Sequence, residues 1–116
     1  MKIIDSGHTY ELRSYDGIQE NILTFMKRYG CSYPGNENEY PGTNCQEVLR
    51  ALIDRVKYLH NQIPHQRNIL ILDNLRQALY SFESRAAERR GRILGPEICV
   101  YAIEHYETCP KCGHIH

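Results

Sequence analysis

The sequence has no net charge, no tryptophan and no long apolar run. Fourteen Lys and Arg residues balance fourteen Asp and Glu residues in a chain of 116. Because duplex DNA and anionic membranes attract net positive charge, this balance argues against a protein that coats either of them. No apolar run approaches the roughly 20 residues of a membrane span, and the first residues lack the apolar core of a signal peptide. The sequence therefore predicts a cytoplasmic protein, and its length predicts a single domain.

Motifs of catalysis are missing as well. The chain has no Gly-x-Ser-x-Gly, no phosphate-binding glycine loop, no His-Glu-x-x-His and no pair of carboxylates in an apolar setting. Four histidines stand alone in the sequence, at His8, His60, His65 and His105. Since nothing pairs a nucleophile with a base, we expect a protein that is not an enzyme.

The first 43 residues are predicted to form β structure and a loop. Thr9–Leu12 and Ile22–Met26 are rich in β-forming residues, and Asp16-Gly17 between them is a turn signal, so we expect a hairpin, with a short first strand at Lys2–Ile4. Residues 29–43 crowd Gly, Pro and Asn into a loop of about 14 residues, a length often linked to function. Its tyrosines either stack on a flat ligand or pin the loop to the body of the protein.

Residues 44–91 are predicted to form two long helices. Asn44 and Glu47 make a capping box for the first helix, which ends before Pro64. The second helix runs from near Asn68 to Gly91, a favourable C-terminal cap. The apolar stripe of the first helix consists of Val48, Leu52, Val56, Leu59 and Ile63, widened by Leu49 and Ile53. The apolar seam of the second helix consists of Leu72, Leu75, Leu79, Phe82 and Ala86.

The link between these helices is short, so they must form an antiparallel helical hairpin. Residues 92–116 then hold a short third helix, opened by Gly95-Pro96 and ending near Tyr106, and a Cys-rich tail. The predicted fold class is α+β, with a small N-terminal sheet packed with the helical hairpin.

The tail resembles half of a zinc site. Cys109 and Cys112 are separated by two residues and followed by glycine, the turn that wraps backbone amides around two thiolates. His114 and His116 are the nearest further ligands, and Cys99 or His105 are alternatives. A structural zinc, an unmetallated reduced tail and a redox pair all stay open, and no cofactor is expected for activity. The total of five cysteines is odd and no export signal is present, so reduced thiols are expected at Cys31, Cys45 and Cys99.

Arginines gather at the end of the second helix. Arg85, Arg89 and Arg92 follow one another at spacings of four and three, which places them on one face. Guanidinium groups offer paired donors to phosphate oxygens, but cations at a helix C-terminus also interact favourably with the helix dipole. Arg55 on the first helix is open to a similar choice between phosphate binding and an ordinary solvated helix surface.

In three stretches the sequence resembles the phage Thoeris anti-defence sponge family, whose hairpin domain is shared with an anti-CBASS sponge family. They are residues 2–12, residues 47–55 and the helix end at residues 79–89. With the intervening strand at 22–27, the resemblance covers roughly residues 1–92, and the Cys-rich tail has no counterpart in it. The specificity of the resemblance lies in the order of these stretches and in the hairpin.

The resemblance implies a protein that sequesters immune signalling nucleotides without degrading them, in the cytoplasm of the infected bacterial host. The ligands would be glycocyclic ADP-ribose of Thoeris and, in some members, cyclic oligonucleotides of CBASS. Family members form homo-oligomers, from dimers to hexamers, with pockets at subunit boundaries. Arg85 and Arg89, with Arg92 and Arg55, would hold phosphate, and Lys27 and Arg28 would close the pocket. The aromatic residues that would stack on adenine are Phe82, Tyr80 and Phe25.

Two other function classes are open. A small zinc-bearing phage module that binds nucleic acid or protein would use the Cys109/Cys112 turn, the arginines and the tyrosines, although the neutral net charge argues against nucleic acid. A hydrolase would convert the signalling nucleotide, so recovery of intact ligand distinguishes it from a sponge.

Overall fold

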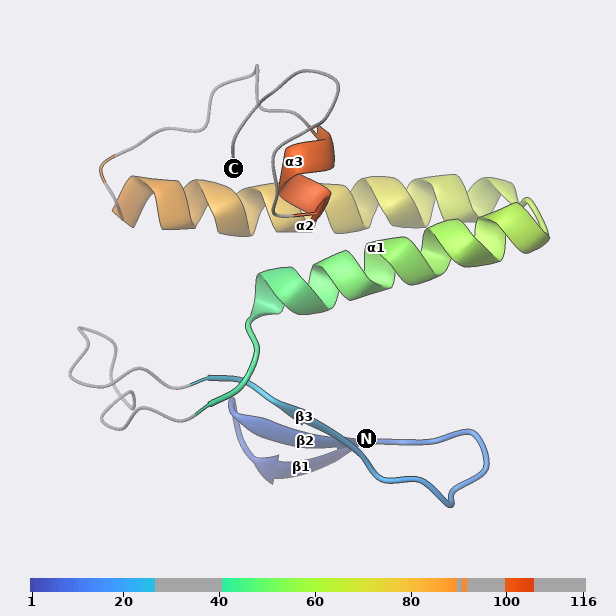
Figure 1. Cartoon of the computed structure of the whole chain (residues 1–116), viewed down its shortest axis with the longest axis vertical. Helices are drawn as coiled ribbons and strands as arrows, with labels where there is room; N and C mark the ends of the chain where they lie inside the picture. The colour runs from blue at the N-terminus through green and yellow to red at the C-terminus, as the bar shows by residue number, and fades with distance from the viewer. Residues whose placement is uncertain (27–40, 90, 92–99, 106–116) are drawn as a thin grey trace. The chain divides into compact units, whose positions relative to one another are not determined.

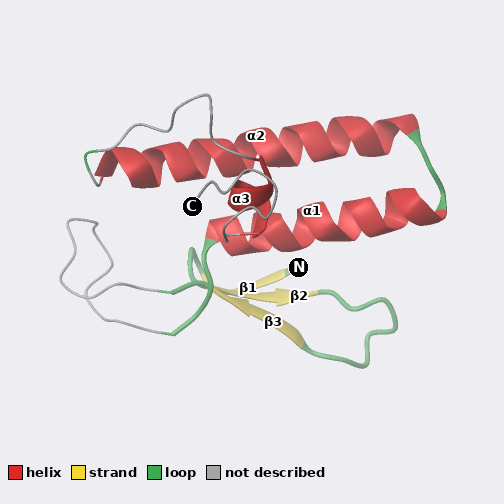
Figure 2. Ribbon diagram, turned by 45° about the horizontal axis from the view of Figure 1, so that its top comes forward, coloured by secondary structure: helices red, strands yellow, loops and turns green. Residues whose placement is uncertain are grey.

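The computed structural model describes residues 1–26, 41–89, 91 and 100–105 (Figure 1). The chain divides into two compact units, Met1–Cys45 and Gln46–His116. The first unit holds a three-stranded antiparallel sheet, and the second holds long helices and one short helix (Figure 2). The predicted α+β class is confirmed.

The sheet consists of β1 (Lys2–Asp5), β2 (Thr9–Leu12) and β3 (Asn21–Thr24), hydrogen-bonded in that order. In the β2–β3 hairpin, Thr9 pairs with Thr24 and Leu12 with Asn21. A register shift interrupts the β1–β2 pairing between Ile3 and Asp5. Both the hairpin and the short first strand were predicted correctly, except that β3 ends at Thr24 rather than Met26.

Asp16 and Gly17 lie in the connection between β2 and β3, as predicted. The Asp16 carboxylate accepts a hydrogen bond from the backbone N–H of Ile18 at 3.0 Å, which is an Asx turn. This bond favours the charged carboxylate and lowers the pKa of Asp16 from its ordinary value. Gly17 has φ of 72°, a left-handed conformation that glycine adopts without a steric cost.

The chain returns beside the end of β3 at residues 41–43. The Thr43 N–H donates to the Thr24 carbonyl at 2.8 Å, and the Met26 N–H donates to the Thr43 carbonyl at 2.8 Å. A Cβ atom on Gly42 would lie 2.6 Å from the Thr24 carbonyl oxygen, so only glycine fits this approach. The rest of the predicted loop, including its three tyrosines, lies outside the described residues.

The helical hairpin is formed by α1 (Cys45–Gln62) and α2 (Gln66–Arg89). Figure 2 shows the two helices running in opposite directions, joined by a short link, which confirms the predicted hairpin. α2 begins two residues earlier than expected, because the His65 ring Nδ1 accepts the free N–H of Arg67 at 3.0 Å and acts as a cap. Gly91 has φ of 72°, as a glycine cap at the other end requires.

The core of the helical unit lies between both long helices and α3 (Val100–His105). Figure 1 shows α3 against α2, and only residues 100–105 of the predicted third helix are described. The buried core residues are Ile53, Leu72, Leu79 and Ile103, with Leu49, Val56 and Leu75 packed against them. The predicted seam of α2 therefore faces the core at Leu72, Leu75 and Leu79, whereas toward the end of the helix Glu83 and Ala87 are buried and the predicted Phe82 and Ala86 are half-buried.

The predicted stripe of α1 is displaced by about one residue. Ile53 is 2% exposed, whereas Leu52 is 44% and Ile63 is 77% exposed. One residue turns a helix by about 100°, so the face centred on Leu52 points away from the core that Ile53 enters. The reason is that α2 and α3 contact the side of α1 that carries Ile53 and Arg50.

In the part of the chain that the structure describes, neither long helix nor α3 is apolar and long enough to span a membrane.

Candidate functional site

Arg50 is a buried arginine at the junction of the three helices. Its side chain is 8% exposed and donates three hydrogen bonds. Nη1 donates to Glu47 at 2.9 Å, Nη2 donates to the buried Glu83 of α2 at 2.7 Å, and Nε donates to the Ile103 carbonyl of α3 at 2.8 Å. Because its three nitrogens each donate to an acceptor and the acceptors come from all three helices, Arg50 fixes α3 on the hairpin.

Glu104 of α3 lies between cations from the two long helices. Its carboxylate is 6% exposed and pairs with Nε of Arg76 on α2 and, at 3.8 Å, with Nζ of Lys57 on α1. The cations themselves are less covered, since the Arg76 side chain is 38% exposed and that of Lys57 is 39% exposed. An acid of the short helix thus occupies an anion position built by the hairpin.

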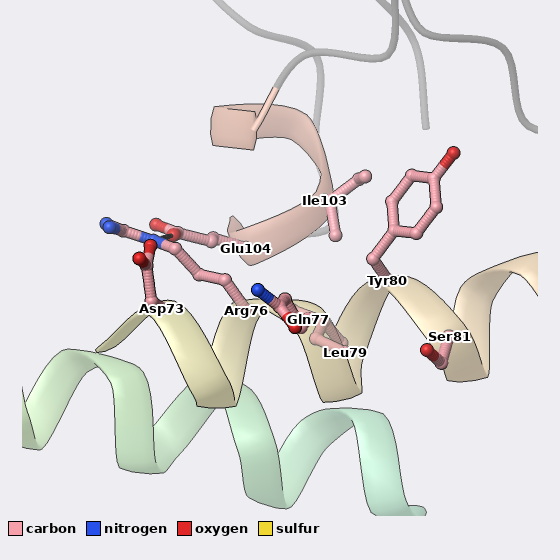
Figure 3. A pocket seen from close by; sticks show the side chains of 8 residues that line it. All are labelled: Asp73, Arg76, Gln77, Leu79, Tyr80, Ser81, Ile103 and Glu104. Carbon is pink, nitrogen blue, oxygen red and sulfur yellow. Dashed lines mark hydrogen bonds and ion pairs between the residues drawn. The ribbon is translucent and has the colours of Figure 1, made fainter. Parts of the chain in front are cut away.

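Two pockets flank Glu104, one on each side of α3. The larger, of about 500 Å³, opens between α2 and α3 (Figure 3). Its lining residues are Asp73, Arg76, Gln77, Leu79, Tyr80, Ser81, Ile103 and Glu104. The smaller, of about 280 Å³, opens on the α1 side and is lined by Glu47, Arg50, Ala51, Ile53, Asp54, Lys57, Glu104 and His105.

The larger pocket combines a cation, an aromatic ring, two carboxylates and two neutral polar side chains. Figure 3 shows Tyr80 of α2 beside Ile103 of α3 at one end of the pocket, and Arg76 beside Glu104 toward the other end. Gln77 and Asp73 come from the same face of α2. Such a set can hold a phosphate at the guanidinium, cover a planar ring with the phenol and hydrogen-bond its polar edges.

The arginines predicted to bind phosphate lie on another part of α2. Arg85 and Arg89 are exposed near its C-terminal end, where Arg89 Nε donates to the Arg85 carbonyl at 3.4 Å. At about 100° per residue, Arg85 and Arg89 are turned about 140° and about 180° from Tyr80. Within one chain, therefore, α2 does not bring the predicted arginines to the pocket that Tyr80 lines.

The other predicted ligand-binding residues are spread over the described structure. Phe82 is half-buried on the seam of α2, and Arg55 is exposed on α1, 5.6 Å from the ring centroid of Tyr58. Phe25, in the sheet unit, packs edge-on against Tyr10 with ring centroids 6.0 Å apart. Lys27, Arg28 and Arg92 lie outside the described residues.

The predicted zinc ligands Cys109, Cys112, His114 and His116 lie outside the described residues, as does Cys99. His105, the other alternative ligand, is at the end of α3 and lines the smaller pocket. Over residues 1–26, 41–89, 91 and 100–105, no three His, Cys, Asp or Glu side chains gather as a metal site would require. The zinc prediction stays a prediction.

Sequence reasoning missed the buried charges that organise this region. Glu83 follows Leu79 by four residues, so a carboxylate stands at a core-facing position of α2, and it is 7% exposed. Arg50 lies three residues before the buried Ile53, also on the core side of α1. Since Lys, Glu, Arg and Asp are rarely buried unless paired, these two positions carry a readable signal of an ion pair. Nothing local in the sequence indicates that Glu104 pairs with Arg76.

No protein-family model, no curated protein and no solved structure matches this chain.

Proposed function

We propose that this protein binds and sequesters cyclic nucleotide immune signals without degrading them, in the cytoplasm of an infected bacterial host. The ligands are glycocyclic ADP-ribose and, as a second class, cyclic oligonucleotides. The observation that carries the proposal is the exposed pair Arg85 and Arg89 at the end of α2, on a helical hairpin in a chain of zero net charge. Two guanidinium groups one turn apart match the spaced oxygens of a pyrophosphate.

The binding pockets form between copies of the chain. Exposed apolar side chains on both long helices support a homo-oligomer, because large exposed apolar surfaces in soluble proteins mark contact sites. These side chains include Leu52 and Leu59 on α1, Ile63 directly after it, and Ile69, Leu70 and Ile71 on α2. A pocket between subunits can gather arginines from several chains while each chain stays neutral.

Calorimetry of the purified full chain tests the proposal. We expect tight binding of a glycocyclic ADP-ribose isomer or of a cyclic di- or trinucleotide, with intact ligand recovered after the protein is denatured. Arg85→Ala or Arg89→Ala weakens binding at least about tenfold, since one hydrogen bond to a charged group is worth about 1.5–3 kcal/mol. Arg67→Ala is the matched control, because Arg67 is exposed in the first turn of the same helix.

Three outcomes contradict parts of this proposal. Unchanged affinity in both Arg85 and Arg89 variants removes these residues from the site. Recovery of a converted nucleotide replaces the sponge by a hydrolase. No heat with any of the nucleotides rejects the sponge altogether.

A further inference from the structure

We infer that the pocket between α2 and α3 is a binding site for a phosphorylated nucleoside, in which the Glu104 carboxylate occupies the position of the phosphate until the ligand displaces it. The inference takes its ligand class from the proposed function. It assigns that class to a different place, within a single chain and away from Arg85 and Arg89.

The first argument is the anion position. Arg76 and Lys57 come from different helices and converge on one carboxylate that is 6% exposed. A guanidinium presents the same paired donors to a carboxylate as to a phosphate, so the two anions are interchangeable partners for Arg76. Both cations keep more than a third of their side-chain surface open, and an anion arriving from solvent can reach them while Glu104 is still bound.

The second argument is the pocket beside that position. Its volume of about 500 Å³ falls within the range of small-molecule sites. Tyr80 is 42% exposed and stands beside Ile103 at the opposite end from Arg76 (Figure 3). A base covered by the Tyr80 ring, with Leu79 and Ile103 as apolar lining, leaves Gln77 and Asp73 for the polar edges of base or ribose.

The third argument is the way α3 is attached. Ile103 is held in the core and its carbonyl accepts a hydrogen bond from Arg50. α3 therefore keeps two attachments to the hairpin when the Glu104 carboxylate leaves Arg76 and Lys57. Glu104 acts as a tethered competitor at an effective concentration of about millimolar or more. Removing its charge therefore raises the affinity of a phosphorylated ligand, whereas an acid that merely stabilises α3 has no such effect.

The test is a titration of the full chain with adenosine monophosphate and, separately, inorganic pyrophosphate, followed by calorimetry. Glu104→Gln binds adenosine monophosphate at least about tenfold more tightly than the wild type, because the competing charge is gone. Glu88→Gln changes net charge by the same amount at an exposed position of α2 and leaves the affinity unchanged. Arg76→Ala abolishes the gain when combined with Glu104→Gln.

Because Glu104→Gln can loosen α3, the pocket is also tested from α2 in the wild-type background. Tyr80→Leu weakens binding of adenosine monophosphate about fivefold or more and leaves pyrophosphate unchanged, since only the nucleoside has a ring to stack. Equal affinity in Glu104→Gln and Glu88→Gln overturns the inference, as does full binding by Arg76→Ala. Equal loss of both probes in Tyr80→Leu overturns the assignment of the base to that ring.

These results separate the inference from the proposed function. If Arg85→Ala abolishes binding of glycocyclic ADP-ribose while adenosine monophosphate binds no variant, the pocket inference is wrong and the sponge stands. If Glu104→Gln gains affinity for adenosine monophosphate while the cyclic signals give no heat, the pocket inference is supported and the proposed sponge function is wrong.

Discussion

At the scale of the residue, the buried ion pair of Arg50 and Glu83 holds the helices of the helical unit together. Arg50 and Glu83 are both below a tenth exposed and bond to each other at 2.7 Å. Burial of a charge costs several kcal/mol unless hydrogen bonds compensate it, and here three acceptors surround one guanidinium. The pair therefore specifies how α3 and α2 meet α1.

Replacing Arg50 by methionine tests this role. Arg50→Met keeps the length of the side chain and removes its charge, which leaves the Glu83 carboxylate buried without the guanidinium. We expect the free energy of unfolding to fall by about 3 kcal/mol or more, measured by urea denaturation.

The exposed Arg55→Met on the same helix is the control and should change stability by less than about 0.5 kcal/mol. The double variant Arg50→Met with Glu83→Leu should recover most of the loss, since no lone charge is then buried. A loss in Arg50→Met no larger than in Arg55→Met would contradict the role assigned to the pair.

At the scale of the element, residues 41–43 extend the sheet beside β3, and the close approach of the two backbones leaves no room for a side chain at Gly42. Residues 41–43 pair with the end of β3 through two backbone hydrogen bonds, and Gly42 passes within contact of the β3 backbone. Met26 and Thr43 are thereby held together at the β3 edge of the sheet.

Gly42→Ala should break this closure. A Cβ atom at 2.6 Å from a backbone oxygen forces one strand to move, and overpacking of this kind costs about 1–3 kcal/mol. The amide protons of Thr43 and Met26 should then exchange with solvent at least about fivefold faster in hydrogen-exchange experiments. Gln19→Ala, at an exposed site between β2 and β3, serves as the comparison, and equal protection of these amides in both variants would show that the sheet tolerates the methyl group.

At the scale of the whole molecule, the chain exposes more apolar surface on its helices than its small core can use. Only five apolar side chains in the described residues are buried, whereas Leu52 and Leu59 on α1 and Ile63 just beyond its end are exposed. A chain this short buries a limited fraction of its surface, so association with further copies is the natural means of covering such side chains.

We expect sedimentation equilibrium of the full chain to give a mass of at least twice the 13.6 kDa of one chain. Leu59→Lys should lower that mass at micromolar concentration, because a charge in an apolar interface is costly to desolvate. Gln62→Lys adds the same charge at an exposed polar position of α1 and should leave the mass unchanged. A monomer at all concentrations would contradict the oligomer.

The sequence by itself determined the elements, because their determinants are local. Stretches rich in β-forming residues on either side of Asp16-Gly17 predicted the hairpin. Asn44, Pro64 and Gly91 predicted both ends of α1 and the end of α2, whereas the start of α2 lies two residues before the predicted one. The seam of α2 was also readable, since a helix with Leu72, Leu75 and Leu79 on one side has a single apolar face to bury. The apolar face of α1 is wider, so periodicity alone chose the wrong centre.

Only the tertiary structure decided which side of α1 is buried and which charges meet. Glu104 contacts Arg76 across 28 residues of sequence, and Arg50 contacts Glu83 across 33. Helical periodicity reports the direction of each side chain around its own axis and carries no information about which helix lies opposite. The arginines at 85 and 89 could thus be assigned to one helix end from sequence, whereas the pocket of Tyr80, Arg76 and Glu104 exists because α3 packs across the hairpin and brings a distant carboxylate to its cations.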